Sequence, residues 1–177
     1  MIIMVHPGGE KEAPHHGILQ AGEREYPCAL GRAGISADKR EGDGATPAGR
    51  FTLRRILYRA DRLTSLSTAL PFTAIGPDDG WCDAADHPQY NQPARLPFAA
   101  SAEKLWREDG LYDLVVIIGH NDDPAIAGAG SAIFLHVAGP AFAPTEGCVA
   151  LERDVLVTLV AALKPGDEIA MNETGRR

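Results

Sequence analysis

Apolar residues along the chain stand mostly in short runs that are separated by glycine- and proline-rich turns. Residues 17–20 and 25–30 are two such runs, and residues 51–58 form a third one behind the turn segment 41–50. Residues 114–118 are a continuous run of leucine, valine and isoleucine. Short runs between turns are typical of strands, and a continuous β-branched run is typical of a buried strand. The pattern predicts a mainly β protein, with a bulge where two arginines interrupt the alternation of 51–58.

Alternation in residues 131–138 predicts a strand with two different faces. Phe134 and His136 lie on one face, because side chains two positions apart point the same way in a strand. The opposite face is aliphatic and carries Ile133, Leu135 and Val137. Residues 147–151 predict a further short strand with Cys148 on one side, and the loop between the two strands is long enough to let them lie side by side.

The clearest helical pattern covers residues 152–163. Apolar side chains recur there every three or four positions, as expected for one buried helix face: Val155, Leu156, Leu159, Val160 and Leu163. The sequence Lys164-Pro165-Gly166 ends this helix. Residues 100–108 predict a second, short helix, and residues 167–171 predict a closing strand.

Length and composition indicate one domain over residues 1–177. The 177 residues are 45% hydrophobic, which is enough to bury a core. The formal net charge of −7 argues against nucleic-acid binding, which needs a basic surface. The longest apolar run is too short to span a membrane, and the first residues lack the basic and apolar regions of a signal peptide. The N-terminal stretch with His6, His15 and His16 is expected to be frayed.

Five arginines lie between positions 50 and 62 with one acidic residue, Asp61, among them; they are Arg50, Arg54, Arg55, Arg59 and Arg62. Two interpretations stay open. The arginines form either a solvated strand face or a strip that binds carboxylates, since the guanidinium group can make paired hydrogen bonds to a carboxylate.

The three cysteines are Cys28, Cys82 and Cys148, and their odd number and wide spacing suit neither a disulfide framework nor a zinc ribbon. The first two stand where buried, inert cysteines are expected. Cys148 follows Gly147 on a predicted tight turn just ahead of the helix. Adjacent N–H groups at this turn could stabilise an oxyanion, and a nearby helix N-terminus would lower the pKa of the thiol.

A cysteine nucleophile needs a base, and His136 is the best placed of the six histidines. It lies twelve residues before Cys148 and on the predicted shared face. His120 follows the run 114–118 after one glycine and is interpreted as a strand-end histidine. A zinc site made of His120, His136 and Cys148 is an alternative, but no HExxH or CxxC spacing supports it. We expect no metal and no cofactor.

The stretch FLHVAGPAFAPTEGCVAL (134–151) resembles the active-site motif of the L,D-transpeptidase catalytic domain family (YkuD-like, ErfK/YbiS). In that family a strand histidine is followed by [Ser/Thr]-His-Gly-Cys-[Ile/Val]-x-[Leu/Met], and the matching residues here are His136, Thr145, Gly147, Cys148, Val149 and Leu151. Upstream, GDGATPAGRF (42–51) is similar to the family's Gly-Asp-x-x-Thr-Pro-x-Gly-x-Phe segment. The segments GWCD, YN (90–91) and VIIGHND look like those of its shorter branch. The resemblance covers a core of about residues 17–171.

The resemblance implies a β barrel or sandwich with one helix near the C-terminus, at about 152–163. It implies that Cys148 attacks a peptidoglycan stem peptide after an L-configured centre, typically diaminopimelate, releases D-alanine and passes the acyl group to an amine. His136 would be the base, oriented by a backbone carbonyl near residues 137–139, and the N–H groups of Gly147 and Cys148 would form the oxyanion hole. Water as the acceptor would make the protein an L,D-carboxypeptidase. The family implies a cell-envelope or periplasmic location, whereas the lack of a visible signal peptide keeps a cytoplasmic one open.

Two positions depart from the family pattern. Glu146 stands where a second histidine is usual, and Ala150 stands where an arginine is frequent. These departures keep open a third possibility, a peptidoglycan-binding module without turnover. Besides the catalytic set of Cys148, His136 and Gly147, we expect substrate contacts from Thr145, Glu146, His120 and Arg50.

Overall fold

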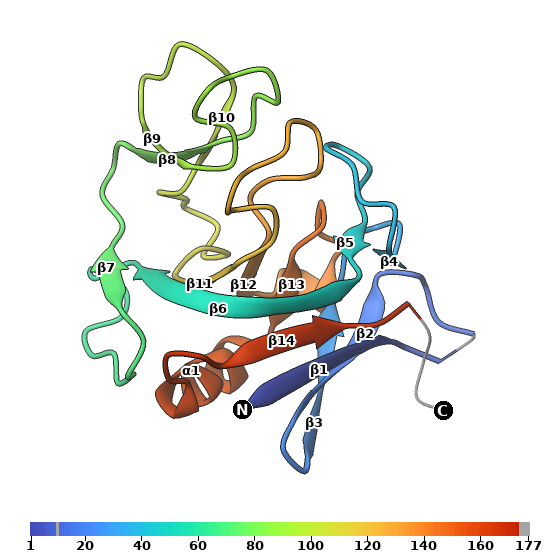
Figure 1. The fold of residues 1–177 in the computed structure, drawn as a ribbon. Helices are drawn as coiled ribbons and strands as arrows, with labels where there is room; N and C mark the ends of the chain where they lie inside the picture. The colour runs from blue at the N-terminus through green and yellow to red at the C-terminus, as the bar shows by residue number, and fades with distance from the viewer. Residues whose placement is uncertain (10, 174–177) are drawn as a thin grey trace.

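The computed structural model describes residues 1–9 and 11–173, and most of its regular structure is strand (Figure 1). In chain order the elements are β1 (Ile2–Pro7), β2 (His16–Ala21), β3 (Arg24–Ala29), β4 (Ile35–Ser36), β5 (Thr46–Pro47), β6 (Gly49–Tyr58), β7 (Phe72–Ala74), β8 (Asp79–Cys82), β9 (Pro93–Arg95), β10 (Ala102–Lys104), β11 (Leu114–Ile118), β12 (Phe134–Val137), the 3-10 turn η1 (Pro140–Phe142), β13 (Val149–Leu151), α1 (Arg153–Ala162) and β14 (Glu168–Met171).

A nine-stranded sheet forms the body of the molecule, in the order β11-β12-β13-β3-β2-β1-β14-β6-β7. Strand β6 also pairs with β11, and this pairing closes the strands of this sheet other than β7 into a barrel. Strands β10, β8 and β9 form a separate three-stranded sheet. Figure 1 shows this small sheet at one end of the barrel and α1 at the other. The mainly β fold with one α-helix is therefore confirmed.

The central strands have two buried faces, and each face belongs to a different cluster. All five residues of β11 are buried. Leu114, Val116 and Ile118 join the large cluster that also contains the buried face of α1. Val115 and Ile117 point the other way and join a smaller cluster with Trp81, Tyr112, Phe134 and Cys148. The predicted alternation of β12 is confirmed in the same way, since Leu135 lies in the first cluster and Phe134 in the second.

The predicted bulge in β6 is present. Val116 of β11 pairs with Ile56, but Ile118, two residues on, pairs with Leu53, three residues back. The extra residue falls at Arg54-Arg55, where the sequence alternation breaks. Such a bulge bends a strand. The first residues of β6 pair with β14, and its last residues pair with both β11 and β7.

Two expectations about local structure are wrong. The N-terminal stretch is not frayed, because β1 pairs with β2 and β14 inside the main sheet and buries Ile3 and Val5 completely. The packed core therefore begins upstream of residue 17. The predicted helix at 100–108 is absent, since its middle forms β10 and pairs with β8. Pairing with a distant strand outweighs the local helix propensity there.

Candidate active site

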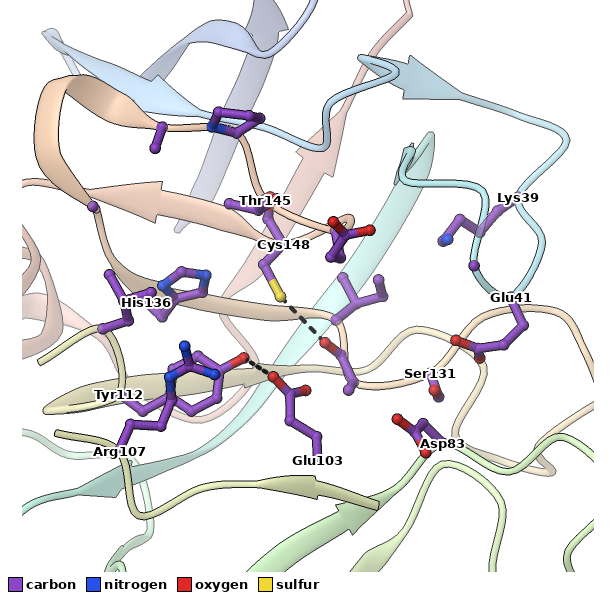
Figure 2. A pocket seen from close by; sticks show the side chains of 18 residues that line it. Lys39, Glu41, Asp83, Glu103, Arg107, Tyr112, Ser131, His136, Thr145 and Cys148 are labelled. Carbon is purple, nitrogen blue, oxygen red and sulfur yellow. Dashed lines mark hydrogen bonds between the residues drawn. The ribbon is translucent and has the colours of Figure 1, made fainter. Parts of the chain in front are cut away.

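A pocket of about 470 Å³ lies beside the smaller cluster and contains both predicted reacting groups. Figure 2 shows Cys148 and His136 on one wall of this pocket, with Tyr112 beneath the imidazole. The pocket is lined by Lys39, Glu41, Gly42, Asp83, Glu103, Arg107, Leu111, Tyr112, Ser131, Ala132, Ile133, His136, Gly139, Ala143, Pro144, Thr145, Glu146 and Cys148.

The parallel pairing of β12 with β13 brings Cys148 and His136 to the same face. His136 pairs with Ala150 and Leu135 with Val149, so Cys148 falls opposite Phe134. The backbone N–H of Phe134 donates to the sulfur at 3.3 Å, and the thiol donates to the carbonyl oxygen of Ala132 at 3.2 Å. The thiol is thus held between a backbone N–H of β12 and a backbone carbonyl of the segment just before β12.

His136 is oriented through its Nδ1 atom, which lies 2.8 Å from the carbonyl oxygen of Val137. Because a carbonyl can only accept a hydrogen bond, Nδ1 carries the proton and Nε2 keeps a free lone pair. The backbone carbonyl expected near residues 137–139 is therefore found at Val137. The Tyr112 ring packs edge-on against the imidazole with 5.2 Å between ring centroids. This packing and the hydrogen bond together hold the ring in place.

Burial keeps both reacting groups neutral. It raises the pKa of Cys148 to about 12, with a further increase from the Glu103 charge, and it lowers the pKa of His136 to about 4. The resting pair is therefore a thiol and an imidazole. The expectation that a helix N-terminus lowers the thiol pKa is wrong, because β13 separates Cys148 from the start of α1 at Arg153.

The turn before Cys148 is built by Thr145 and Gly147. The Thr145 hydroxyl donates to the carbonyl oxygen of Cys148 at 2.7 Å and accepts the N–H of Gly147 at 3.1 Å. Gly147 has a φ of +140°, and a Cβ atom there would lie 2.8 Å from the carbonyl oxygen of Ala45. Glycine is therefore required at position 147 by both backbone conformation and space.

The remaining predicted substrate residues lie in different places. Glu146 lines the pocket mouth, is largely exposed and forms an ion pair with Arg32. His120 lies outside the pocket lining, with Nε2 2.9 Å from the carbonyl oxygen of Ala129. Arg50 also lies outside it and pairs with Glu168. Thr145 and Glu146 thus line the same pocket as the thiol, whereas His120 and Arg50 do not.

Four of the five arginines between positions 50 and 62 are neutralised by carboxylates of the chain itself. These pairs are Arg50 with Glu168, Arg54 with Asp122, Arg59 with Asp61, and Arg62 with Asp113 and Glu108. This pairing favours the structural interpretation of the arginines over a strip that binds substrate carboxylates.

Sequence reasoning missed the polar side chains that line the rest of the pocket. Tyr112 donates to Glu103, and burial raises the pKa values of both groups. Asp83 lies in the stretch 76–97 around Trp81, which is rich in aspartate, and this composition was the one available signal. Glu103 stands in the segment where a helix was predicted, and no local pattern places it beside a cysteine 45 positions further on.

The alternative zinc site would need His120, His136 and Cys148 together, and the pocket contains only the last two. Within residues 1–9 and 11–173, no group of three histidine, cysteine, aspartate or glutamate side chains is placed to hold a metal ion. In the same part of the chain, no helix has the length and apolar character needed to cross a membrane.

Comparison with known proteins agrees with the motif. The sequence matches the model of the L,D-transpeptidase catalytic domain (YkuD) over residues 16–171. No curated protein sequence matches the chain.

Several solved structures are similar over almost the whole chain. Bd1075 of Bdellovibrio bacteriovorus is 17% identical with a TM-score of 0.46, covering 97% of this chain and 48% of that one. An L,D-transpeptidase from Mycobacterium tuberculosis H37Rv is 14% identical with a TM-score of 0.41, covering 97% and 57%. L,D-transpeptidase 3 from Mycobacterium tuberculosis is 14% identical with a TM-score of 0.44, covering 97% and 60%.

The chain spans about half to three fifths of the length of these solved proteins. Their low identity and TM-scores carry no argument about activity. The sequence match is different in kind, because it covers nearly all of the chain and includes the histidine, the glycine turn and the cysteine. This chain belongs to the L,D-transpeptidase catalytic domain (YkuD) family.

Proposed function

We propose that the protein is a cysteine acyltransferase that acts on peptidoglycan stem peptides. One observation carries the proposal: Cys148 and His136 line one pocket, and the Val137 carbonyl holds the imidazole with Nε2 free to accept a proton. A buried cysteine without such a neighbour is inert, whereas a thiol beside an oriented base can act as a nucleophile.

The first half of the reaction forms a thioester. His136 Nε2 takes the thiol proton while the sulfur attacks the carbonyl carbon after the L-configured centre of the stem peptide. The C–N bond then breaks, and the leaving D-alanine takes that proton from His136 on its amino group. The low pKa of His136 and the high pKa of Cys148 oppose proton transfer in the empty pocket. Transfer therefore accompanies attack, when the negative charge moves from sulfur to the carbonyl oxygen.

That oxygen needs hydrogen-bond donors while it is negative. We assign this role to the backbone N–H of Cys148, joined by the N–H of Gly147. The Gly147 N–H donates to the Thr145 hydroxyl in the resting pocket, so it becomes available when that hydroxyl turns away. A donor that is free before the reaction stabilises a developing oxyanion without a reorganisation cost, whereas the Gly147 N–H can join only after this rearrangement. Glu146 lies at the pocket mouth, where it can contact the arriving stem peptide.

The second half transfers the acyl group from Cys148 to an acceptor. An amine from a neighbouring stem would give a cross-link, and water would give L,D-carboxypeptidase activity. A peptidoglycan substrate also implies that the protein works in the cell envelope.

Intact-mass spectrometry after incubation with a stem tetrapeptide tests the proposal. We expect an adduct with the mass of the peptide minus D-alanine, mapped to Cys148 and absent from Cys148→Ala. Cys82→Ala is the matched control, since Cys82 is also fully buried but does not line the pocket, and it should still be acylated. No adduct would contradict the proposal and favour the binding-module alternative, and an adduct on another cysteine would contradict the assignment of Cys148.

A further inference from the structure

One buried side chain outside the pocket, that of Asn91, connects to both backbone groups that hold the Cys148 thiol. Asn91 is 7% exposed and does not line the pocket. Its Oδ1 atom accepts the backbone N–H of Ala132 at 3.0 Å, and the Ala132 carbonyl in turn accepts the thiol hydrogen bond. Figure 2 draws the second of these hydrogen bonds as the dashed line from the sulfur. A single residue therefore separates Asn91 from the proposed nucleophile.

The same Oδ1 atom also leads to the second partner of the thiol. It accepts the indole N–H of Trp81 at 2.9 Å, and the Trp81 ring packs edge-on against the Phe134 ring with 5.2 Å between ring centroids. The backbone N–H of Phe134 donates to the sulfur. Because both contacts of the sulfur lead back to one carboxamide oxygen, a change at Asn91 should reach both of them.

All four hydrogen-bonding positions of the Asn91 carboxamide are used. Oδ1 accepts two hydrogen bonds, and Nδ2 donates to the carbonyl oxygens of His120 at 3.0 Å and Asn121 at 2.7 Å. A primary amide has two acceptor lone pairs and two donor hydrogens, so none is left over. The backbone N–H of Asn91 donates to the Cys82 carbonyl at the end of β8. The carboxamide is therefore fixed, and it ties both ends of the loop 119–133 to the small sheet.

Ala132 has a backbone conformation that needs such support. Its φ of +52° lies in the left-handed region, which the Cβ atom of alanine disfavours. A residue keeps this conformation only where its surroundings hold it. The hydrogen bond from Asn91 holds the N–H side of Ala132, and the carbonyl of the same residue meets the thiol. Without that hydrogen bond, we expect Ala132 to relax and its carbonyl to turn away from the sulfur.

We propose that Asn91 is a positioning residue for the nucleophile: it holds Ala132 in the left-handed conformation, so that the Ala132 carbonyl keeps the sulfur of Cys148 in the place from which His136 can take its proton. This inference goes beyond the proposed function and rests on it only for the effect on turnover. Rotation about the Cβ–Sγ bond can direct the thiol proton from Ala132 toward His136 without moving the sulfur. Asn91 thus acts through Ala132 and Trp81 rather than on the reacting atoms.

The Ala132 carbonyl also favours the neutral form of the thiol. A carbonyl can only accept a hydrogen bond, so it binds the thiol and would repel a thiolate. Burial, with a further increase from the Glu103 charge, raises the pKa of Cys148 to about 12, and the Phe134 N–H opposes this increase. Turning the Ala132 carbonyl away should therefore lower the pKa of Cys148 while it loosens the sulfur. The titratable groups around the thiol stay the same when Asn91 is replaced by alanine; they are Lys39, Glu103, Tyr112 and His136.

Asn91→Ala tests the inference through two readouts that should change in opposite directions. Alkylation of Cys148 by iodoacetamide, assigned by peptide mass spectrometry, should shift to lower pH by about one unit, which corresponds to the loss of one hydrogen bond. Turnover of the stem tetrapeptide should fall about tenfold or more in kcat with KM unchanged, because the sulfur is misplaced and Asn91 does not line the pocket. General loosening of the protein would instead expose the buried Cys28 and Cys82 to alkylation as well, and that result would overturn the inference.

Ala132→Gly provides the second arm of the test, because glycine adopts the left-handed conformation without the Cβ penalty. If Asn91 acts by holding Ala132, the Asn91→Ala change should shift the alkylation profile less in the Ala132→Gly background than in the wild type. Equal shifts in the two backgrounds would mean that the two positions act independently, and would overturn the inference.

Asn121→Ala is the matched control, since it removes a carboxamide from the same loop. That carboxamide makes three hydrogen bonds with Ile126 and Gly130, and within the described residues it makes none with Ala132. We expect a lower melting temperature and an unchanged alkylation profile of Cys148. A shift as large as that of Asn91→Ala would show that any loosening of the loop moves the thiol, and would overturn the role of Asn91.

Asn91→Asp keeps the test decisive if Asn91→Ala does not fold. The aspartate retains the oxygen that accepts the Ala132 N–H and lacks the two Nδ2 donor hydrogens. Its alkylation profile should not move to lower pH, because the Ala132 carbonyl stays in place and the added charge disfavours a thiolate; a shift to lower pH would overturn the inference. Alkylation needs no stem peptide, so a wild type that the tetrapeptide does not acylate would overturn the proposed function, whereas the alkylation shifts decide the role of Asn91 separately.

Discussion

Cys28 and Cys148 are both buried free thiols, and burial raises the pKa of each to about 12. Their surroundings differ completely. Cys28 lies in β3 and packs into the large aliphatic cluster, and burial alone accounts for its raised pKa. Cys148 lies in the smaller cluster beside the pocket, between the Phe134 N–H and the Ala132 carbonyl. Burial therefore does not distinguish Cys28 from the proposed nucleophile Cys148, whereas the oriented imidazole that lines the same pocket does.

The same contrast separates the two faces of β12. Leu135 points into the large cluster, and its neighbour His136 points into the pocket. The large cluster holds the barrel together through aliphatic contacts with α1. The pocket face carries the polar groups, which the backbone and Tyr112 hold in position. Stability and chemistry are thus placed on opposite faces of the same strands.

Replacing each of the two cysteines by serine should give the largest difference between the pocket and the large cluster. Cys148→Ser should lower acyl transfer by on the order of a thousandfold or more, because a hydroxyl is a much weaker nucleophile beside the same base. Cys28→Ser should instead lower the free energy of unfolding by about 1–3 kcal/mol, since it buries a hydroxyl among aliphatic side chains.

Release of D-alanine per folded molecule and urea denaturation measure the two effects. Substantial transfer by Cys148→Ser, or a rate loss in Cys28→Ser beyond its unfolded fraction, would contradict the assignment of the two cysteines.

Acid should destabilise the pocket face through His136. Burial lowers the pKa of this imidazole from 6.5 to about 4, so the folded state favours its neutral form. The stabilising contribution is complete above pH 6.5 and is lost as the pH falls toward 4, by about 3 kcal/mol in all. Urea denaturation across this range should show a smaller loss in His136→Asn than in the wild type, and the loss should not vanish because burial also lowers the pKa of His120.

His87→Asn, a change in the loop after β8, should retain the acid-dependent loss. If His136→Asn loses stability between pH 6.5 and 4 as steeply as the wild type, the buried neutral imidazole is not its source.

Gly147→Ala should disturb the turn before Cys148, and it should destabilise the protein less than protonation of His136 does. Position 147 has a φ of +140°, and a Cβ atom there would press on the Ala45 carbonyl. We expect the free energy of unfolding to fall by about 2 kcal/mol, with a loss of acyl transfer per folded molecule. Gly22→Ala is the control, because its φ is also positive, at +62°, but no atom lies within 4 Å. It should cost about 1 kcal/mol and leave the rate unchanged, and an equal rate loss in both would contradict the role of the turn.

Arg50→Ala should have the smallest effect. Arg50 is more than half exposed in its ion pair with Glu168, and surface pairs contribute about 1 kcal/mol or less. The Michaelis constant for the stem peptide should stay unchanged, because Arg50 lies outside the pocket lining. An increase of that constant at constant stability would return Arg50 to the substrate-binding residues that its sequence context suggested.

Features that depend on neighbouring residues were predictable. The helix over 152–163 follows from its apolar period and its Pro-Gly end, and the structure places it at Arg153–Ala162. The alternation of β12 correctly put Phe134 and His136 on one face. Features that depend on pairing between distant segments were not predictable in this way. The N-terminal stretch with His6, His15 and His16 was expected to be frayed, and β1 is ordered by its hydrogen bonds to β2 and β14.

For the site, the sequence by itself singled out the proposed reacting pair, because strand alternation and a short connection predict that His136 and Cys148 lie on one face, and the pairing of β12 with β13 agrees with that prediction. It also determined the need for glycine before the cysteine. Only the tertiary structure decided the protonation of that pair and the acidic side chains that line the pocket beside it. Burial of the thiol and the imidazole is a property of the whole surrounding cluster, and Glu41, Asp83 and Glu103 come together only when three loops and strands far apart in the chain fold around one pocket.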